Sequence, residues 1–197
     1  MPSRALSRWA REAGLELDEL EAAHARVGST RRTGRALARQ IAHAYLVAIA
    51  AQFQRFCRDL HSEASQHLAD AVEPKVFRGA VLRLLTEGRR LDAGNANAGT
   101  LGADFDRLGL EFWAEVEATA ANRRLLRDLE RLNVWRNAIV HQDFTLKPGR
   151  EKLVRGTTPD RIRDVRRWRE SCDALARIFD GIVRSHVGGV VGGAPWR

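Results

Sequence analysis

The sequence predicts an all-α fold, an antiparallel helical bundle preceded by an added N-terminal helical arm. Almost every segment longer than ten residues repeats its apolar side chains at the spacing of an α-helix. No segment shows the convincing alternation of apolar and polar residues that is typical of a half-buried strand. With 197 residues, the chain is long enough to form one domain with a sizeable core.

The first part of the chain is predicted to contain the arm and one long helix. Two short amphipathic stretches, 3–13 and 15–27, are separated by Gly14. The segment Gly28-Ser29-Thr30 is expected to interrupt the helical structure and to cap the next helix. That helix runs from about residue 32 to residue 71. The expected apolar stripe of this helix consists of Leu37, Ile41, Ala44, Val47 or Ala48, Ala51 and Phe56.

Shorter elements are expected after Pro74, which ends the long helix. They are a helix at 75–87, a turn-rich loop at 91–99, a helix within 101–118, a helix at 122–141 and a polar, basic connection at 143–157.

The last helix has a clear predicted start at Thr158-Pro159-Asp160. This segment offers a capping hydroxyl, a proline for the first turn and an acid near the positive end of the helix dipole. The helix is predicted to reach about residue 187. We therefore divide the chain into an arm at 1–29, a helical domain at 30–187 and a flexible tail at 188–197.

The chain carries a net charge of +8, from 33 Lys and Arg against 25 Asp and Glu. Such a balance favours polyanionic partners, because each phosphate contact releases a condensed counterion. Only three of the basic residues are lysines, and arginine, alanine and glycine are abundant. A GC-rich genome produces this composition whatever the function, so the charge alone does not identify the partner.

Several classes of protein do not fit this sequence. No window approaches the roughly 18–20 apolar residues that cross a bilayer, and no apolar segment of a signal peptide follows Arg4 and Arg8. Cys57 and Cys172 are too few for a disulfide framework or a cysteine-bound metal. We expect a cytoplasmic protein in a reducing compartment, with no membrane partner.

The helix at 122–141 carries the most informative residue, Arg136. At about 100° per residue, one apolar face of this helix is formed by Leu125, Leu129, Leu132, Trp135 and Ile139. Arg136 falls in the middle of that face. A buried charge without a partner costs several kcal/mol. Either the face opens onto a cleft or a subunit boundary, or Arg136 has a dedicated anionic partner.

A polar ridge lies beside Arg136 on the same helix. Asn133, Asn137 and His141 follow one another at intervals of four residues. Arg136 and His141 are five residues apart, which places them about 140° apart around a regular helix. They could converge if the last turn is frayed, or if each faces its equivalent across a two-fold axis.

These residue types suit the cleavage of RNA. Histidine, with an unperturbed pKa of about 6.5, both accepts and donates a proton near neutrality. The planar fork of arginine matches phosphate oxygens and stabilises the charge of a pentacovalent phosphorane. The ribose 2′-hydroxyl supplies the nucleophile, so we expect no metal and no cofactor. Asn137 could hold the phosphate or orient the histidine.

The segment Arg136-Asn137-Ala138-Ile139-Val140-His141 resembles the motif of HEPN ribonucleases: an arginine, a polar residue, three to five others and a histidine. The resemblance covers about 30–186. It implies a helical homodimer with a shared active site, in which Arg136, Asn137 and His141 act on RNA. It also implies metal-independent cleavage to 2′,3′-cyclic phosphate and 5′-hydroxyl ends, in a toxin or antiphage system with a possible antitoxin or regulatory protein.

A second group of residues is expected to bind the RNA backbone. Between residues 147 and 169 there are nine basic and three acidic residues. The predicted RNA-binding residues are Asn133, Arg150, Lys152, Arg155, Arg163, Arg166 and Arg167. The alternative is a solvated helix face. Trp168 could stack on a base, but a tryptophan at such a position more often faces the core.

Three other interpretations remain open for the motif. Arg136 and His141 could be cations that stabilise the negative end of a helix. The chain could also be a non-catalytic HEPN module that binds a nucleotide, a nucleic acid or a partner protein. A purely structural role would be supported if Arg136 were paired with an internal carboxylate and sealed from solvent.

Overall fold

All regular structure in the described part of the chain is helical, which confirms the all-α prediction. The structure is a computed structural model that describes residues 1–27 and 32–196. The break and cap expected at Gly28-Ser29-Thr30 lie outside the described residues. No helix within these ranges is both long enough and apolar enough to span a membrane.

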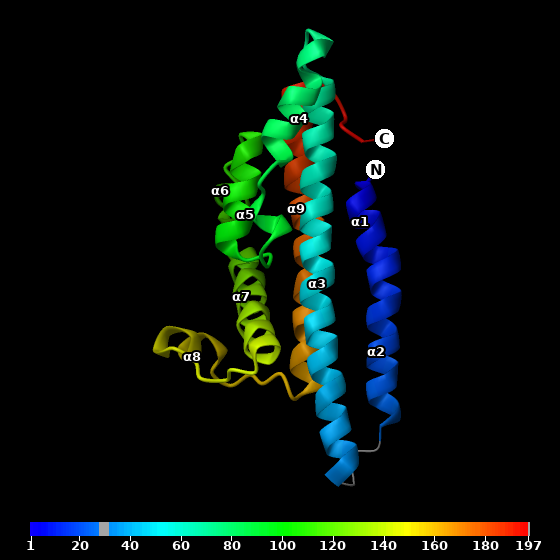
Figure 1. Ribbon diagram of the computed structural model, residues 1–197, viewed down its shortest axis with the longest axis vertical. Coiled ribbons are helices and arrows are strands. Elements are labelled where there is room, and N and C mark those ends of the chain that lie inside the picture. The colour runs from blue at the N-terminus through cyan, green and yellow to red at the C-terminus, as the bar shows by residue number, and fades with distance from the viewer. Residues whose placement is uncertain (28–31, 197) are drawn as a thin grey trace.

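Two long helices lie side by side at the centre of the bundle, α3 (Arg32–Asp70) and α9 (Ile162–Val191) (Figure 1). They run in the same direction, since Tyr45 of α3 contacts Arg169 of α9, and further along both helices Phe53 packs on Phe179, with ring centroids 5.9 Å apart (Figure 1). Helix α7 (Ala120–His141) and the N-terminal helix run the opposite way on either side of them (Figure 1). The helical bundle is thus confirmed, and its antiparallel neighbours surround a parallel central pair.

The N-terminal segment forms one continuous helix. It consists of α1 (Arg4–Arg8), a π-helical turn (Trp9–Ala13) and α2 (Gly14–Arg26). Its buried residues, Ala5, Trp9, Ala13 and Leu17, recur every four residues. In an α-helix that spacing drifts by about 40° per step. The wider π-turn offsets the drift and keeps these side chains on the core. Gly14 was expected to separate two stretches, but it has helical dihedral angles and does not interrupt the helix.

Backbone hydrogen bonds fix the start of the N-terminal helix to both central helices. The amide of Ser3 donates to the Asp180 carboxylate of α9 at 3.1 Å. The amides of Arg4 and Ala5 donate to the two oxygens of Glu63 on α3, also at 3.1 Å. These bonds satisfy donors that a helix N-terminus otherwise leaves without a partner. The segment predicted as an arm therefore packs along the bundle and contributes to its core.

The short helices lie on the side of the central pair that faces away from the N-terminal helix (Figure 1). They are α4 (Arg78–Thr86), α5 (Ala98–Phe105), α6 (Phe112–Glu117) and α8 (Pro148–Val154). Gly109, with a φ of 73°, divides the segment expected to contain one helix into α5 and α6. Helix α8 lies inside the segment that was expected to be only a connection, and Pro148 occupies its first turn.

The predicted limits of the last helix are wrong at both ends. Helix α9 begins at Ile162, because the amide of Asp160 donates to the hydroxyl of Thr158 in a turn that precedes it. It also continues to Val191, past the boundary predicted for the tail. Trp196, near the end of that tail, is only 6% exposed, and its ring lies 5.7 Å from that of His67. Apolar burial therefore continues beyond residue 187.

The apolar face of α3 also differs from the prediction. Ala44 and Ala51 are exposed, and Leu37 is 48% exposed. The prediction is correct for Phe56, which is 3% exposed, and for Val47 and Ala48, which pack partly buried on the core. The rest of the buried face is formed by residues that were not predicted, Tyr45, Leu46, Ile49, Phe53, Cys57 and Leu60. Alanine is frequent on every side of this helix, so several stripes have similar hydrophobicity. The positions of the large aromatic residues distinguish the true one.

Candidate functional site

The apolar face of α7 holds the motif in place. Leu129, Leu132 and Ile139 belong to the hydrophobic core, and Leu125 and Trp135 pack on it partly buried. The predicted face is therefore confirmed. It fixes the rotation of α7 and determines how far the neighbouring polar side chains project into solvent.

Arg136, which was predicted in the middle of this face, is half-buried and therefore partly open to solvent. Its Nη1 atom donates a hydrogen bond to Oδ1 of Asn137 at 3.1 Å. Within the described ranges, no carboxylate oxygen lies within 4.0 Å of its guanidinium nitrogens. The condition for a purely structural role, an internal carboxylate partner, is thus not met among these residues. The guanidinium has donors in reserve for an external anion.

The asparagines of the ridge are attached to the loop that precedes α5. Asn95 donates from Nδ2 to Oδ1 of Asn137 at 2.8 Å. Asn133, which is 8% exposed, donates to the carbonyl oxygen of Ala96 at 2.9 Å. Asn137 therefore accepts from both Asn95 and Arg136. This arrangement holds the arginine without neutralising it.

His141 is the last residue of α7 and is exposed. The helix stays regular up to its end. Gln142 follows in the left-handed conformation with a φ of 51°, and the amide of Asp143 donates to the carbonyl oxygen of Ala138 at 3.0 Å. A frayed last turn is therefore not present. Arg136 and His141 of one chain point about 140° apart.

Apolar side chains are exposed around His141. Val140 is 46% exposed and Phe144 is 48% exposed. The ring centroid of Phe144 lies 6.3 Å from that of His43 on α3. The end of α7 therefore combines an exposed imidazole with apolar surface.

Some of the residues predicted to bind the RNA backbone are exposed, and others already have partners within the protein. Arg150, Lys152 and Arg155, on and just after α8, are exposed, and so is Arg163. Arg166, by contrast, forms an ion pair with Glu21 at 2.5 Å. The remaining two, Arg167 and Asn133, also have partners inside the fold.

Arg167 belongs to an ion-pair cluster centred on Asp128 of α7. Asp128 is only 1% exposed and lies 3.1 Å from Nη2 of Arg167 and 2.9 Å from Nη1 of Arg131. The hydroxyl of Ser171 donates to the same carboxylate at 3.1 Å. This cluster joins α7 to α9 and leaves Arg167 committed to an internal partner.

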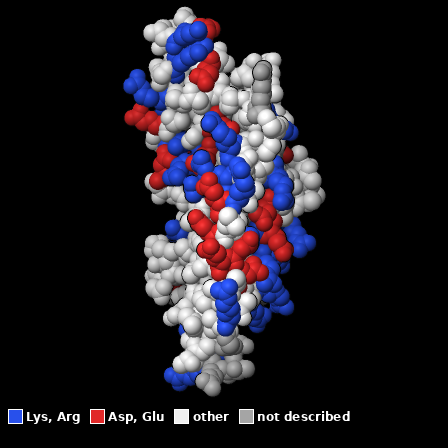
Figure 2. Space-filling view, turned by 90° about the vertical axis from the view of Figure 1, so that its right-hand side faces the viewer, with Lys and Arg blue, Asp and Glu red and all other residues white. Residues whose placement is uncertain are grey.

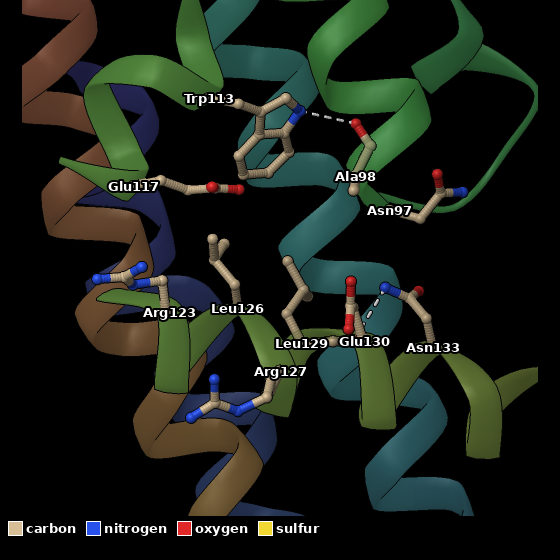
Figure 3. Close-up of a pocket in the computed structure, with 10 residues that line it drawn as sticks. All are labelled: Asn97, Ala98, Trp113, Glu117, Arg123, Leu126, Arg127, Leu129, Glu130 and Asn133. Carbon is tan, nitrogen blue, oxygen red and sulfur yellow. Dashed lines mark hydrogen bonds between the residues drawn. The ribbon is translucent and has the colours of Figure 1, made fainter. Parts of the chain in front are cut away.

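A cavity that the sequence analysis did not predict lies next to Asn133 (Figure 3). It has a volume of about 370 Å³. Its walls are formed by Asn97, Ala98, Trp113, Glu117, Arg123, Leu126, Arg127, Leu129, Glu130 and Asn133. Trp113 packs on the hydrophobic core with part of its ring. It is half-buried, and its indole Nε1 donates to the carbonyl oxygen of Ala98 at 2.9 Å.

The cavity lies on the same face of α7 as the polar ridge. Arg123, Arg127, Glu130 and Asn133 are three or four residues apart, and Asn137 continues the series. This spacing was a signal in the sequence. The residues from α5 and α6 that close the cavity gave no such signal, because nothing in the sequence shows which segments approach α7.

Three titratable groups in the core have pKa values that burial shifts. Burial raises the pKa of Cys57 and of Cys172, and both are free thiols that pack in the core as small apolar residues. Burial lowers the pKa of His61 to about 4, so its ring is neutral near pH 7. Trp168 is 1% exposed and is a core residue.

In the described part of the chain, no group of three or more His, Cys, Asp or Glu side chains is placed to hold a metal ion. In comparisons with known proteins, no protein-family model, no curated protein and no solved structure matches this chain.

Proposed function

We propose that the protein is a metal-independent endoribonuclease of the HEPN type that acts as a homodimer. The observation that carries the proposal is the environment of Arg136. Its half-buried guanidinium is held by the neutral amide of Asn137, with no carboxylate within 4.0 Å among the described residues. Its remaining N–H donors meet no anion among these residues and can receive one from outside. The phosphodiester of RNA is such an anion and matches its planar fork.

The proposed reaction needs only the side chains of the motif. His141 removes the proton from the ribose 2′-hydroxyl, and the 2′-oxygen attacks the adjacent phosphorus. The bond between phosphorus and the 5′-oxygen breaks, and a protonated imidazole donates a proton to that oxygen. Arg136 stabilises the negative charge of the phosphorane, and Asn137 keeps Arg136 in place. The products carry a 2′,3′-cyclic phosphate and a 5′-hydroxyl.

A second copy of the chain is part of this proposal. In one chain, the regular end of α7 turns Arg136 and His141 about 140° apart. Two chains related by a two-fold axis bring two arginines and two histidines to one cleft, so that one histidine acts as the base and the other as the acid. The exposed Val140 and Phe144 beside His141 supply apolar surface for such a contact.

The test is to incubate the purified protein with a mixed RNA pool in EDTA and to map the new ends. We expect cleavage in the parent, and a loss of at least about 100-fold in both Arg136→Ala and His141→Ala. The exposed Arg124 on α7 and the half-buried His24 on α2 supply matched controls, and Arg124→Ala and His24→Ala should cleave like the parent. Cleavage by either motif variant at the parental rate contradicts the mechanism.

The biological role follows from the same proposal. An unregulated endoribonuclease damages its own cell, so we propose a toxin or antiphage effector controlled by a partner protein. Expression of the parent should arrest growth, and the His141→Ala variant should not.

One observation favours a second candidate, a non-catalytic HEPN module that binds a nucleotide, a nucleic acid or a partner protein. Among the described residues, no hydrogen bond orients the ring of His141, although a catalytic histidine is usually held by a second group. Salt-sensitive RNA binding without any product would support this alternative.

A further inference from the structure

We propose that the cavity beside Asn133 binds a guanine base of single-stranded RNA. That this guanine belongs to an RNA substrate rests on the ribonuclease function proposed above. That the cavity binds guanine rests on the residues that line the cavity. Figure 3 shows the indole of Trp113 above Leu126 and Leu129, with Glu117 on one side and Glu130 on the other.

The position of the cavity relates it to the motif. Along α7, Glu130, Asn137 and His141 are separated by seven and four residues, so all three fall within about 40° of one another around the helix. At 1.5 Å per residue, Asn137 lies roughly 10 Å along the helix from Glu130. A strand bound along this face would place one base in the cavity and a neighbouring phosphate beside Asn137, which accepts a hydrogen bond from Arg136.

The walls of the cavity suit a flat ring. Trp113 is held by its bond to the carbonyl oxygen of Ala98 and by Phe112, with ring centroids 5.0 Å apart. The indole fits closely there because residue 102 is a glycine, since a Cβ atom at Gly102 would lie 2.7 Å from its Nε1. A fixed aromatic face stacks on a base of any identity.

The charges around the cavity select among bases. Within the described ranges, Glu117, Arg123, Arg127 and Glu130 form no ion pair with one another or with other residues. The arginines suit a phosphate. All four side chains are exposed. A ligand that stacks on Trp113 therefore also meets the carboxylates of Glu117 and Glu130, which accept hydrogen bonds and favour a ligand that brings donors. Guanine presents its N1–H and its amino group side by side, which matches the two oxygens of one carboxylate. Uracil has no amino group.

The test measures binding by isothermal titration calorimetry. Its first arm compares GMP with UMP. Its second arm compares two single-stranded 2′-O-methyl oligonucleotides, one with a single guanine and one with uracil in its place, which lack the nucleophile and cannot be cleaved. We expect the guanine ligand to bind about tenfold more tightly in both arms. Glu130→Gln should remove this preference.

Two further variants separate the contributions to binding. Trp113→Ala should weaken GMP and UMP by a similar factor, because stacking does not distinguish bases. Glu115→Gln on α6 is the matched control, since this exposed glutamate does not line the cavity, and it should bind like the parent.

Equal binding of the guanine and uracil ligands, or a preference that survives in Glu130→Gln, would overturn the inference. A preference for GMP that is absent with the oligonucleotides would assign the cavity to a free nucleotide and would also overturn it. Failure to cleave RNA overturns only the proposed function, because none of these measurements depends on cleavage.

Discussion

Asp128 and Arg136 lie on the same helix, eight residues apart, and each is a charged residue at the edge of the core. Asp128 is 1% exposed and contacts two guanidinium groups and a hydroxyl. Arg136 is half-buried, and within the described ranges its guanidinium donates a hydrogen bond to a neutral amide and forms no ion pair. The first charge is balanced inside the fold, and the second has donors left for something outside it.

The same contrast extends over the surface. The face formed by the N-terminal helix carries intermingled acidic and basic side chains (Figure 2). Several pair across helices, such as Arg8 with Asp59 at 2.5 Å and Arg169 with Asp18 at 2.6 Å. The charged residues of the cavity on α7 form no such pairs among the described residues. The charges of the cavity are therefore open to a ligand, whereas the paired charges on the face of the N-terminal helix already have partners.

The largest expected effect on stability comes from removing the buried charge of Asp128. Asp128→Asn should lower the free energy of unfolding by about 3 kcal/mol, because it leaves two guanidinium groups without their buried partner. Arg136→Ala should lower it by less than about 1 kcal/mol, since no ion pair is lost. Urea denaturation measures both. Similar losses in the two variants would show that Arg136 is a structural residue and would remove the contrast.

A second test uses the pH dependence of stability at a buried group whose hydrogen bonds are complete. His61 donates from Nε2 to the carbonyl oxygen of Asp104, and its pKa is lowered from 6.5 to about 4, first by burial and also by the nearby Arg89. The unfolded chain therefore binds this proton more readily than the folded one. Stability from this group is complete above about pH 6.5 and falls by on the order of 3 kcal/mol as the pH decreases to 4.

The variant His61→Gln provides the control for that test. Its unfolding free energy, measured in urea at pH 7 and at pH 4.5, should depend less on pH than that of the parent. If the two proteins show the same pH dependence, another group is responsible.

The smallest effect is expected on RNA binding by the basic residues. Arg150→Ala and Lys152→Ala, at exposed positions of α8, should each reduce the slope of log affinity against log salt by about 1. Arg166→Ala should change it less, because Arg166 is already paired with Glu21. Fluorescence anisotropy with a labelled RNA over a range of salt measures the slopes. An equal change for Arg150 and Arg166 would mean that internal pairing does not decide which arginines bind RNA.

Local sequence patterns predicted the helices and the face of α7 well. The spacing of Leu129, Leu132 and Ile139 indicated that face correctly, because large apolar residues occur there at one clear period. The stripe of α3 was predicted only in part, because its alanines contribute too little to distinguish one side of the helix from another. The start of α9 was also predicted too early, since Thr158 and Asp160 bond to each other in a turn before the helix begins.

The candidate site was only partly predictable, because its residues come from several elements. Arg136, Asn137 and His141 share one helix, so the spacing alone related them. Asn95, Trp113 and the internal partners of Arg166 and Arg167 come from other elements, and only the packed chain brings them together. Spacing within a helix can identify a face, but it cannot identify what lies opposite that face.

The docking of the N-terminal helix has a consequence for the order of folding. The ring of Trp9 lies 5.7 Å from that of Phe53 on α3, the next long helix in the chain. The amide of Ser3, by contrast, bonds to Asp180 of α9, 177 residues away, and the indole of Trp9 donates to Asp173 of the same helix. Contacts between segments close in sequence form more readily than contacts between distant ones. We therefore expect this helix to settle on α3 first and to gain its bonds to α9 later.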